Sequence, residues 1–206
     1  KHHERSIPPT LLATAMGQVD DVRRVVTPDL KRPGNRLAMV GLSRLDLAGS
    51  QLELVGRVRG GRVPQVDANA CRDAFAAVAA AQRAGLVAAC HDCSDGGLAA
   101  AVAEMAIGGG VGARLALGDV PVEGDGAGWS QAQRDLAIAF TESSGRFVCE
   151  VPAAAVDRFA EAMKSVPWAW IGDVIDGGRL EIVPTDGGAA TAIPVDRLAR
   201  AWRGGA

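Results

Sequence analysis

The stretch that most limits the possible folds runs from residue 67 to residue 117, because its hydrophobic period changes repeatedly. Asp67 is placed to cap a first helix and Gly85 to end it, and the apolar face of this helix is predicted to hold Cys71, Ala74, Phe75, Val78 and Gln82. A short strand then follows over residues 86–92, a second helix over 96–107 and a second strand over 111–117. Helices and strands that alternate without a sharp change of composition predict one layered α/β or α+β domain.

Short elements are also predicted on both sides of this stretch. Toward the start, three apolar or alternating runs are interpreted as strands, over residues 10–19, 36–42 and 50–58. Toward the end, strands are predicted over 146–151, 169–175, 179–183 and 191–195, and helical segments over 153–166 and 196–203. Residues 118–135 are interpreted as a polar, glycine-bearing loop, and the glycines at 108–110 as a helix stop.

Composition excludes several classes of function. Only 4% of the residues are aromatic and none is tyrosine, so a surface for stacking nucleobases is not expected. Lys and Arg number 22 against 24 Asp and Glu, and the net charge of −2 gives no general attraction to nucleic acid or to anionic membranes. No run approaches the roughly 18 uninterrupted apolar residues of a membrane helix. Neither nucleic acid nor a membrane is therefore expected as a partner.

Cysteine usage points to a cellular compartment. Four cysteines in 206 residues do not make a secreted disulfide scaffold, and no secretory signal pattern opens the sequence. A reduced, cytoplasmic protein is therefore expected. Residues 1–10 are interpreted as a linker from an upstream domain, and residues 11–206 as the domain itself.

The segment "CHDCSDGG", residues 90–97, concentrates polar chemistry between a predicted strand and a predicted helix. A zinc or redox site is one interpretation, but a structural zinc site usually needs four ligands, and Cys90 and Cys93 supply only two. A reactive thiol would also lie in the first turn of a helix, whereas Cys90 falls inside the strand. Buried, unreactive thiols explain these cysteines better.

A helix entrance is the better interpretation of the same segment. Ser94 or Asp95 could cap the helix, and capping alone accounts for their polarity. Alternatively, backbone amides near Gly96 and Gly97 could face an anion. Asp92, at the carboxyl end of the strand, is a candidate to hold Mg²⁺ beside a phosphate.

A second polar island covers residues 141–146, "TESSGR", between two apolar runs. From the residues alone, a polar turn and a binding site are equally good explanations of this cluster. Gln65 precedes the cap of the first long helix, and capping explains Asp67 adequately.

Several ordered segments resemble the last domain of phosphoribosylformylglycinamidine synthases, the ATP-dependent amidotransferases of purine biosynthesis. The similarity extends from Ile7 to Trp202 and is carried by "IPPTLLATAMGQVDDVRRVVTPDLKRPGNRLAMVG", "GGRVPQVD", "HDCSDGGLAAAVAEMAIGGGVG", "FTESSGRFVCEV" and "IGDV". The superfamily includes aminoimidazole ribonucleotide (AIR) synthetase, selenophosphate synthetase and thiamine-monophosphate kinase. The resemblance implies an AIR-synthase-type C-terminal domain, a three-layer α/β/α sandwich with a mixed sheet and partly ferredoxin-like topology.

The resemblance also implies roles for individual residues. The chain is similar to the second of two C-domains in the family enzyme. In the first, an aspartate binds Mg²⁺ and a Glu-Ser-Gln triplet contacts the ribonucleotide. These functions fall on Asp92 and on Glu142, Ser143 and Ser144, and a substrate-contacting glutamine falls on Gln65. The nucleotide side of the site would be completed by Ser94, Asp95, Gly96 and Gly97.

One position departs from the family pattern. Ser144 stands where the triplet has glutamine, which argues against substrate binding at this copy. No residue of the chain is assigned a catalytic role, because the family's catalytic histidine and its glycine-rich ATP segments belong to upstream N-domains.

The resemblance thus implies an ATP-dependent ligase that converts formylglycinamide ribonucleotide (FGAR), ATP and glutamine-derived ammonia into an amidine, ADP and phosphate. The implied cofactors are Mg²⁺ and ATP or ADP, and the implied partners are the upstream N-domain, a glutaminase domain or subunit and the small ribonucleotide. The chain alone is expected not to turn over. The alternatives are a non-catalytic structural module, or the C-domain of another superfamily member.

Overall fold

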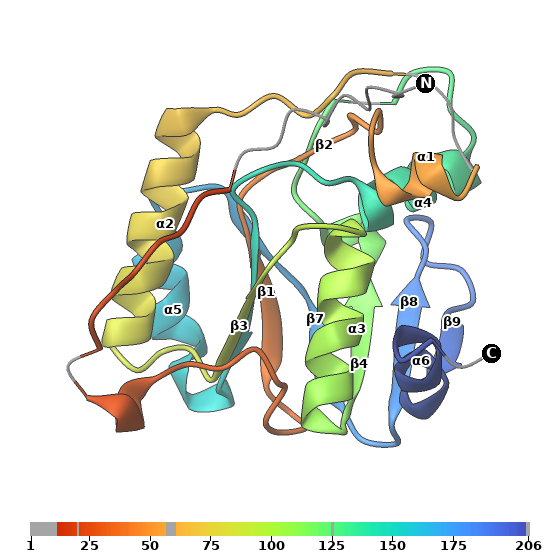
Figure 1. Cartoon of the computed structure of the whole chain (residues 1–206). Helices are drawn as coiled ribbons and strands as arrows, with labels where there is room; N and C mark the ends of the chain where they lie inside the picture. Colours follow the sequence, from red (N-terminus) through yellow and green to blue (C-terminus); the bar gives the residue numbers. More distant parts are fainter. Residues whose placement is uncertain (1–11, 20, 57–60, 125, 205–206) are drawn as a thin grey trace, which may run out of the picture.

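The computed structural model describes residues 12–19, 21–56, 61–124 and 126–204 (Figure 1). Seven strands form one mixed sheet in the order β3-β6-β1-β7-β4-β8-β9, and β2 and β5 form a separate parallel pair. The strands are β1 (Arg36–Val40), β2 (Ser43–Arg44), β3 (Ala89–Asp92), β4 (Gly112–Ala116), β5 (Val122–Glu123), β6 (Phe147–Val151), β7 (Trp168–Ile175), β8 (Arg179–Val183) and β9 (Thr191–Pro194).

Helices cover both faces of the seven-stranded sheet (Figure 1). Helices α3, α4 and α6 pack on one face, and α2 and α5 on the other. Their bounds, with the short α1 and three 3-10 turns, are α1 (Gln51–Leu54), α2 (Ala68–Arg83), α3 (Gly97–Gly109), α4 (Gln131–Phe140), α5 (Val156–Met163), α6 (Val195–Trp202), η1 (Val22–Arg24), η2 (Leu117–Asp119) and η3 (Ala153–Ala155). The expected three-layer α/β/α sandwich is confirmed.

Alternation along β1 shows how one sheet supports two cores. Leu37 and Met39 point into the core beneath α3, whereas Ala38 and Val40 point into the core beneath α2 and α5. All four side chains are 0% exposed. Successive residues of a strand face opposite sides, so a strand buried on both faces must be apolar at every position.

Part of the domain has ferredoxin-like topology. Two β-α-β units, β1-α2-β3 and β6-α5-β7, interleave so that their strands lie in the order β3-β6-β1-β7 with every neighbour antiparallel. Both helices of these units cover the same face of the sheet. The segment from α3 to α4 is inserted between the two units, and β4, β8 and β9 extend the sheet beyond β7, with β4 and β8 parallel. The predicted mixed sheet with partly ferredoxin-like order is confirmed.

Two predicted strands are wrong. The described part of the run 10–19, residues 12–19, has no regular structure and is exposed, with Met16 96% accessible. Within the run 50–58, residues 51–54 form helix α1, whose first turn is capped by the Ser50 side chain. Residues 57–58, like the predicted linker 1–10, lie outside the described residues.

Two further expectations need correction, and two are confirmed. The predicted loop 118–135 contains β5 and the start of α4, and Phe75 is half exposed instead of lying in the core. Asp67 caps α2 as predicted, since its carboxylate accepts the amides of Asn69 and Ala70. The glycine run ends α3 with Gly110 in the left-handed conformation. Among the described residues, the helices are too short or too polar to cross a membrane.

Candidate functional site

Asp92 ends β3 at the rim of the sheet, immediately before the turn into α3. Its side chain is 59% exposed, and its carboxylate accepts a hydrogen bond from the Ser94 hydroxyl. The neighbouring His91 contacts two carboxylates: its Nδ1 lies 3.5 Å from Asp92, and its Nε2 lies 3.1 Å from Glu104 of α3. Asp92 is therefore oriented by its own turn and remains open to solvent.

The β3–α3 turn and the loop between α4 and β6 face each other across a small cavity of about 260 Å³. Four of the residues singled out in the sequence meet there: Asp92, Ser94, Glu142 and Ser144. The other wall residues are Phe75, Cys93, Gly145, Arg146 and Phe147. Two segments about fifty residues apart in the sequence thus contribute polar groups to one cavity.

Glu142 stabilises the ends of two helices. Its Oε1 accepts the backbone amide of Gln51, in the first turn of α1, and the amide of Gly96, the N-cap of α3, each at 2.9 Å. The predicted capping of α3 by Ser94 or Asp95 is wrong, because its N-cap residue is Gly96 and no side chain of the turn caps it. A carboxylate at a helix N-terminus is favourable because the partial charge there is positive.

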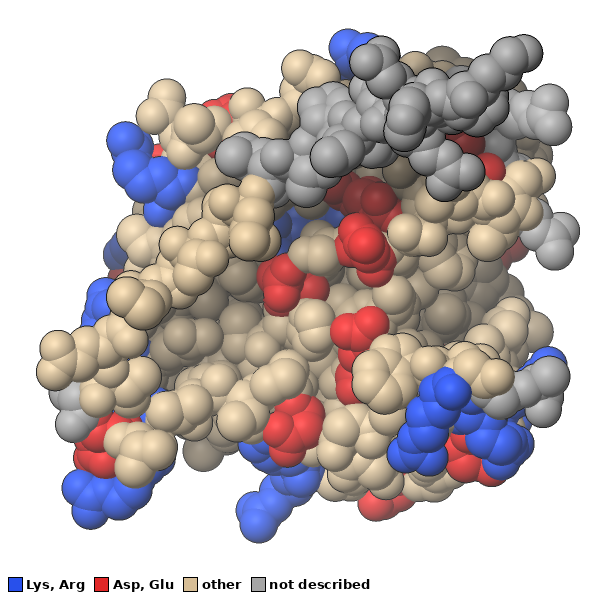
Figure 2. Space-filling model, viewed as in Figure 1, with Lys and Arg blue, Asp and Glu red and all other residues tan. Residues whose placement is uncertain are grey.

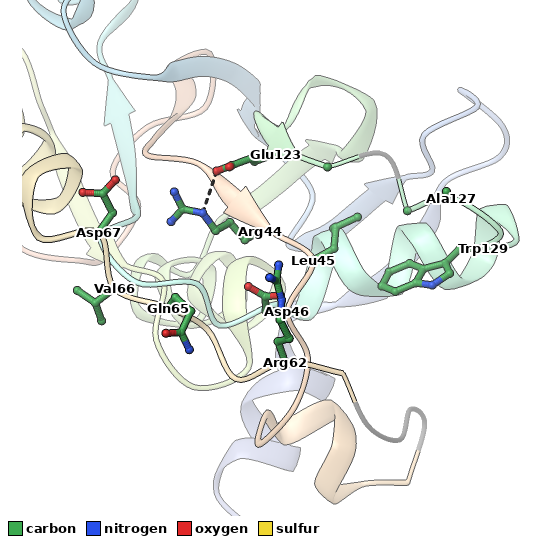
Figure 3. Close-up of a pocket in the computed structure, with 12 residues that line it drawn as sticks. Arg44, Leu45, Asp46, Arg62, Gln65, Val66, Asp67, Glu123, Ala127 and Trp129 are labelled. Carbon is green, nitrogen blue, oxygen red and sulfur yellow. Dashed lines mark hydrogen bonds and ion pairs between the residues drawn. The ribbon is translucent and has the colours of Figure 1, made fainter.

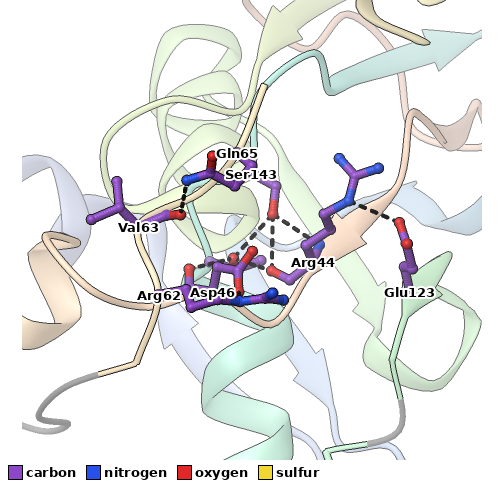
Figure 4. A network of polar contacts seen from close by, with 8 residues as sticks. Arg44, Asp46, Arg62, Val63, Gln65, Glu123 and Ser143 are labelled. Carbon is purple, nitrogen blue, oxygen red and sulfur yellow. Dashed lines mark hydrogen bonds and ion pairs between the residues drawn. The ribbon is translucent and has the colours of Figure 1, made fainter. Parts of the chain in front are cut away.

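Ser143 has a structural role in the same loop. The residue is 1% exposed, and its Oγ accepts the Arg44 amide at 2.8 Å and donates to the Arg44 carbonyl at 2.9 Å (Figure 4). The hydroxyl of Thr141 donates to the same carbonyl. Ser143 therefore ties the loop to β2 and does not line the small cavity.

Arg146 holds the loop from inside. Its side chain is 1% exposed, and the guanidinium donates to the carbonyls of Ser143 and Thr141 and to the Ser43 hydroxyl. Burial lowers the pKa of Arg146 from its usual value, and the nearby Cys93 and Glu142 oppose that shift. A buried cation whose hydrogen bonds go to neutral groups places positive charge behind the cavity wall.

The glycines of the turn serve close packing. A Cβ added at Gly97 would lie 2.3 Å from the Thr141 carbonyl oxygen, so only glycine lets α3 approach the end of α4. The Gly96 amide is bound to Glu142, and the Gly97 amide donates to the Ser94 carbonyl at 2.9 Å. Both amides are therefore occupied by groups of the domain itself.

Gln65 lies in a different and larger cavity, of about 630 Å³ (Figure 3). Its amide donates to the Val63 carbonyl at 3.0 Å (Figure 4). An ion pair of 2.8 Å between Arg44 and Glu123 forms part of the wall. Asp95 is exposed and lines neither cavity. The structure therefore separates Gln65 and Asp95 from the group around Asp92.

A narrow gap of about 30 Å³ lies between the two cavities. It shares Arg44 and Asp67 with the larger cavity, and Ser144 and Gly145 with the smaller one. The two cavities are therefore neighbours, and Arg44 of β2 lines the gap between them.

Sequence reasoning missed the aromatic part of the small cavity. Phe75 of α2 and Phe147 of β6 form an edge-to-face pair with ring centroids 5.3 Å apart. Helical spacing placed Phe75 in the core, and no local pattern says that a half-exposed ring will meet another element. The wall is created only when α2 packs beside β6.

The two cysteines of the CxxC segment cannot act together. Cys93 belongs to the core beneath α3, whereas Cys90 packs against the core beneath α2 and α5. Residues three apart in an extended chain face opposite sides, so these thiols are separated by the sheet. In the described part of the chain, no three His, Cys, Asp or Glu side chains are grouped to hold a metal ion.

Acidic side chains gather down the middle of the face that carries β3 and α3, with basic side chains mostly around the rim (Figure 2).

The fold and this site together define a class of protein: an α/β/α domain with a ferredoxin-like half and a polar cavity at the end of β3. The chain matches the family described as "AIR synthase related protein, C-terminal domain" over residues 32–184. It therefore belongs to this family.

Relatives and solved structures agree with that assignment. The chain is 31% identical over 205 residues to phosphoribosylformylglycinamidine synthase subunit PurL of Cutibacterium acnes, covering 97% of this chain and 25% of that protein. Phosphoribosylformylglycinamidine synthase II of Thermotoga maritima superimposes with a TM-score of 0.70 at 20% identity, covering 86% of this chain and 28% of that one.

Escherichia coli HypE shares the fold more distantly, with a TM-score of 0.58 at 20% identity over 82% of this chain and 52% of that one. The T. maritima protein has been solved with ATP, with ADP and with FGAR. The chain spans about a quarter of the length of its curated relative from C. acnes.

Proposed function

We propose that this chain is the second C-terminal domain of a phosphoribosylformylglycinamidine synthase and forms one wall of a nucleotide or phosphate site. In the parent enzyme, a cytoplasmic ATP-dependent ligase, FGAR, ATP and glutamine-derived ammonia would give the amidine product, ADP and phosphate. Its partners would be the upstream N-domain and a glutaminase domain or subunit. The domain does not turn over alone, because the groups that carry ATP chemistry belong to the absent part.

The observation that supports this proposal is the meeting of Asp92, Ser94, Glu142 and Ser144 at one cavity. Its volume of about 260 Å³ lies just below the roughly 300–1,000 Å³ of pockets that enclose a whole small ligand. A site of this size suits a phosphate with its counter-ion. A complete nucleotide would need a second wall, which fits a domain that covers a quarter of its relative.

The residues of the small cavity could supply part of the ligands of a Mg²⁺ ion, with phosphate oxygens and waters as the others. Mg²⁺ keeps several waters and takes one or two carboxylates together with phosphate oxygens. The small cavity offers two carboxylates, Asp92 and Glu142, and Glu142 already binds two amides through Oε1. Asp92 is therefore the residue that would hold the ion, and the ion would neutralise charge at a phosphoryl group.

The remaining residues position this carboxylate and its surroundings. The Ser94 hydroxyl orients Asp92, and Glu142 fixes the start of α3 beside it. Arg146 holds the Thr141–Ser143 backbone so that Ser144 faces the cavity. Phe75 and Phe147 close one side and limit the access of water.

A structural module is the second candidate. It is favoured by a specific observation: Ser143, Gly96 and Gly97 have their polar groups bound within the domain. Under this reading the same contacts would only brace α1, α3 and β2 against each other, and Asp92 would be an ordinary exposed carboxylate.

Calorimetric titration of the chain with ADP and Mg²⁺ separates the two candidates. We expect Asp92→Asn to weaken binding at least about tenfold, equivalent to roughly 1.4 kcal/mol, because a metal-side carboxylate is lost. Asp95→Asn is the matched control, since Asp95 is a neighbouring exposed aspartate that lines neither cavity, and it should leave binding unchanged.

The same pair of substitutions is then measured in the complete synthase. Equal effects of Asp92→Asn and Asp95→Asn in both settings would leave the structural module as the better account. Formation of the amidine product by the isolated chain would contradict the claim that essential groups lie outside it.

A further inference from the structure

Cys90 and Cys149 face each other across two neighbouring strands. They are register partners in the antiparallel pairing of β3 with β6, and their sulfur atoms are 3.8 Å apart. Neither cysteine is part of the contacts that define the small cavity. The short motif in the sequence suggested Cys93 as the partner of Cys90, whereas the fold provides Cys149.

The backbone of this pair already has a spacing that suits a disulfide. The Cys90 amide donates to Thr27 at 3.3 Å, away from β6, whereas the Cys93 amide donates to the Arg146 carbonyl of the loop leading into β6. Cys90 and Cys149 are therefore a non-hydrogen-bonded antiparallel pair. The Cα atoms of such pairs are about 4.5 Å apart, within the roughly 4.4–6.8 Å that disulfides span. Side-chain rotation alone can bring the sulfurs together.

The surroundings give the two thiols different roles. Cys149 is 0% exposed, whereas Cys90 is partly exposed, so an oxidant can reach only Cys90. Exposure is one condition of thiol oxidation, so Cys90 is the thiol of this pair that reacts first.

We propose that Cys90 and Cys149 are a modification site that forms a reversible intramolecular disulfide on reaction with hydrogen peroxide. The Cys90 thiolate attacks one peroxide oxygen, the O–O bond breaks, and hydroxide leaves and takes up a proton as water. The Cys149 sulfur then attacks the Cys90 sulfenic acid, the S–S bond forms, and a second water leaves. Two thiols are oxidised, and one peroxide is reduced to two waters.

The disulfide would tie β3, which lies at one end of the sheet order, to β6. Asp92 follows Cys90 by two residues on β3, and Phe147 precedes Cys149 by two on β6. A dithiol reductant restores the two thiols by exchange through a mixed disulfide.

The experiment uses the chain carrying Cys93→Ala, so that the tryptic peptide 84–114 retains only Cys90. The reduced protein is treated with hydrogen peroxide, free thiols are alkylated, and tryptic peptides are analysed by mass spectrometry. We expect the peptide 84–114 to be linked to the peptide 147–158 with loss of two hydrogens. In the folded protein, the amount of this linked pair should exceed that of any pair containing Cys71 at least about tenfold. In guanidinium chloride, where the fold is lost, this preference should disappear.

Each other result counts against the site. Cys90 found only as sulfinic or sulfonic acid, or unmodified, overturns the proposal, as does a link between two chains. In the unsubstituted chain, Cys90→Ser must abolish the link to the peptide 147–158. A link that survives this substitution would come from Cys93 and would equally overturn the assignment.

Discussion

At the scale of single residues, one carboxylate and one guanidinium organise the polar loop between α4 and β6. Glu142 accepts the amide of Gln51 in the first turn of α1 and the amide of Gly96, the N-cap residue of α3. Arg146 donates to two carbonyls of the loop and to Ser43. Hydrogen bonds to charged groups contribute about 1.5–3 kcal/mol each when they are buried. The loop that faces the small cavity is therefore held by charge-assisted bonds rather than by apolar packing.

A pH-dependent contribution to stability is expected from Cys93. Burial raises the pKa of this thiol to about 11, from an ordinary value of 9.0. Above pH 9 the unfolded state loses a proton that the folded state keeps, so stability is full below about pH 9 and falls as pH rises toward 11. We expect Cys93→Ala to remove about 2 kcal/mol of the loss between pH 8 and pH 10.5.

Urea unfolding at a series of pH values measures this difference. The raised pKa of Cys149 also acts at alkaline pH, but it is present in both proteins and does not enter the difference between them. Parallel pH profiles for the two proteins would contradict the role given to Cys93.

At the scale of elements, the approach of α3 to α4 depends on Gly97. Gly97 and Gly110 both have positive φ, +64° and +66°. A Cβ added at Gly97 would lie 2.3 Å from the Thr141 carbonyl oxygen, whereas a Cβ added at Gly110 would meet nothing within 4 Å. Both alanine substitutions carry the left-handed strain of about 1 kcal/mol. We expect Gly97→Ala to lower the free energy of unfolding by about 1–3 kcal/mol more, because the helices must separate.

Chemical unfolding of the two variants tests the contact directly, since the shared backbone strain cancels in the comparison. Equal losses of stability would mean that α3 shifts without cost and that the close approach is not needed.

Two helices were missed in the sequence although local signals for both were present. Ser50 is the N-cap residue of α1 and is followed three residues later by Glu53, and Ser130 is the N-cap residue of α4 and is followed three residues later by Gln133. This spacing is the capping-box pattern, and in the structure the side chains of Ser50 and Ser130 accept the amides of the third helical residues. Apolar alternation over residues 50–58 favoured a strand, but the Ser50 cap favours a helix, and residues 51–54 form α1.

At the scale of the whole molecule, one sheet separates two apolar cores. Because β1 contributes side chains to both cores, disruption of the sheet in one core would also expose the other core. We expect a single cooperative transition, in which far-ultraviolet circular dichroism and tryptophan fluorescence give the same midpoint. Trp168 and Trp170 pack against the core beneath α2 and α5, whereas Trp129 and Trp202 are exposed. The signal of the two packed tryptophans therefore reports on that core.

Matched substitutions on the two sides test this coupling. Met105 lies in the core beneath α3 and Met163 in the core beneath α2 and α5, and both are 0% exposed. Each change to alanine should cost about 2–5 kcal/mol and lower the midpoints of both probes together. A variant that shifts only one probe would show that the cores unfold separately.

The sequence by itself determined the layered α/β class, most of the strands and long helices, and the two polar segments around Asp92 and Glu142. Those features depend on local periodicity, capping and turn residues, which act over a few positions. Only the tertiary structure decided that Glu142 caps α3, that Phe75 lines a cavity, that Gln65 lies in another, and that Cys90 faces Cys149. These outcomes depend on which strands pair and which helices pack together, and contacts between distant segments leave no local pattern in the chain.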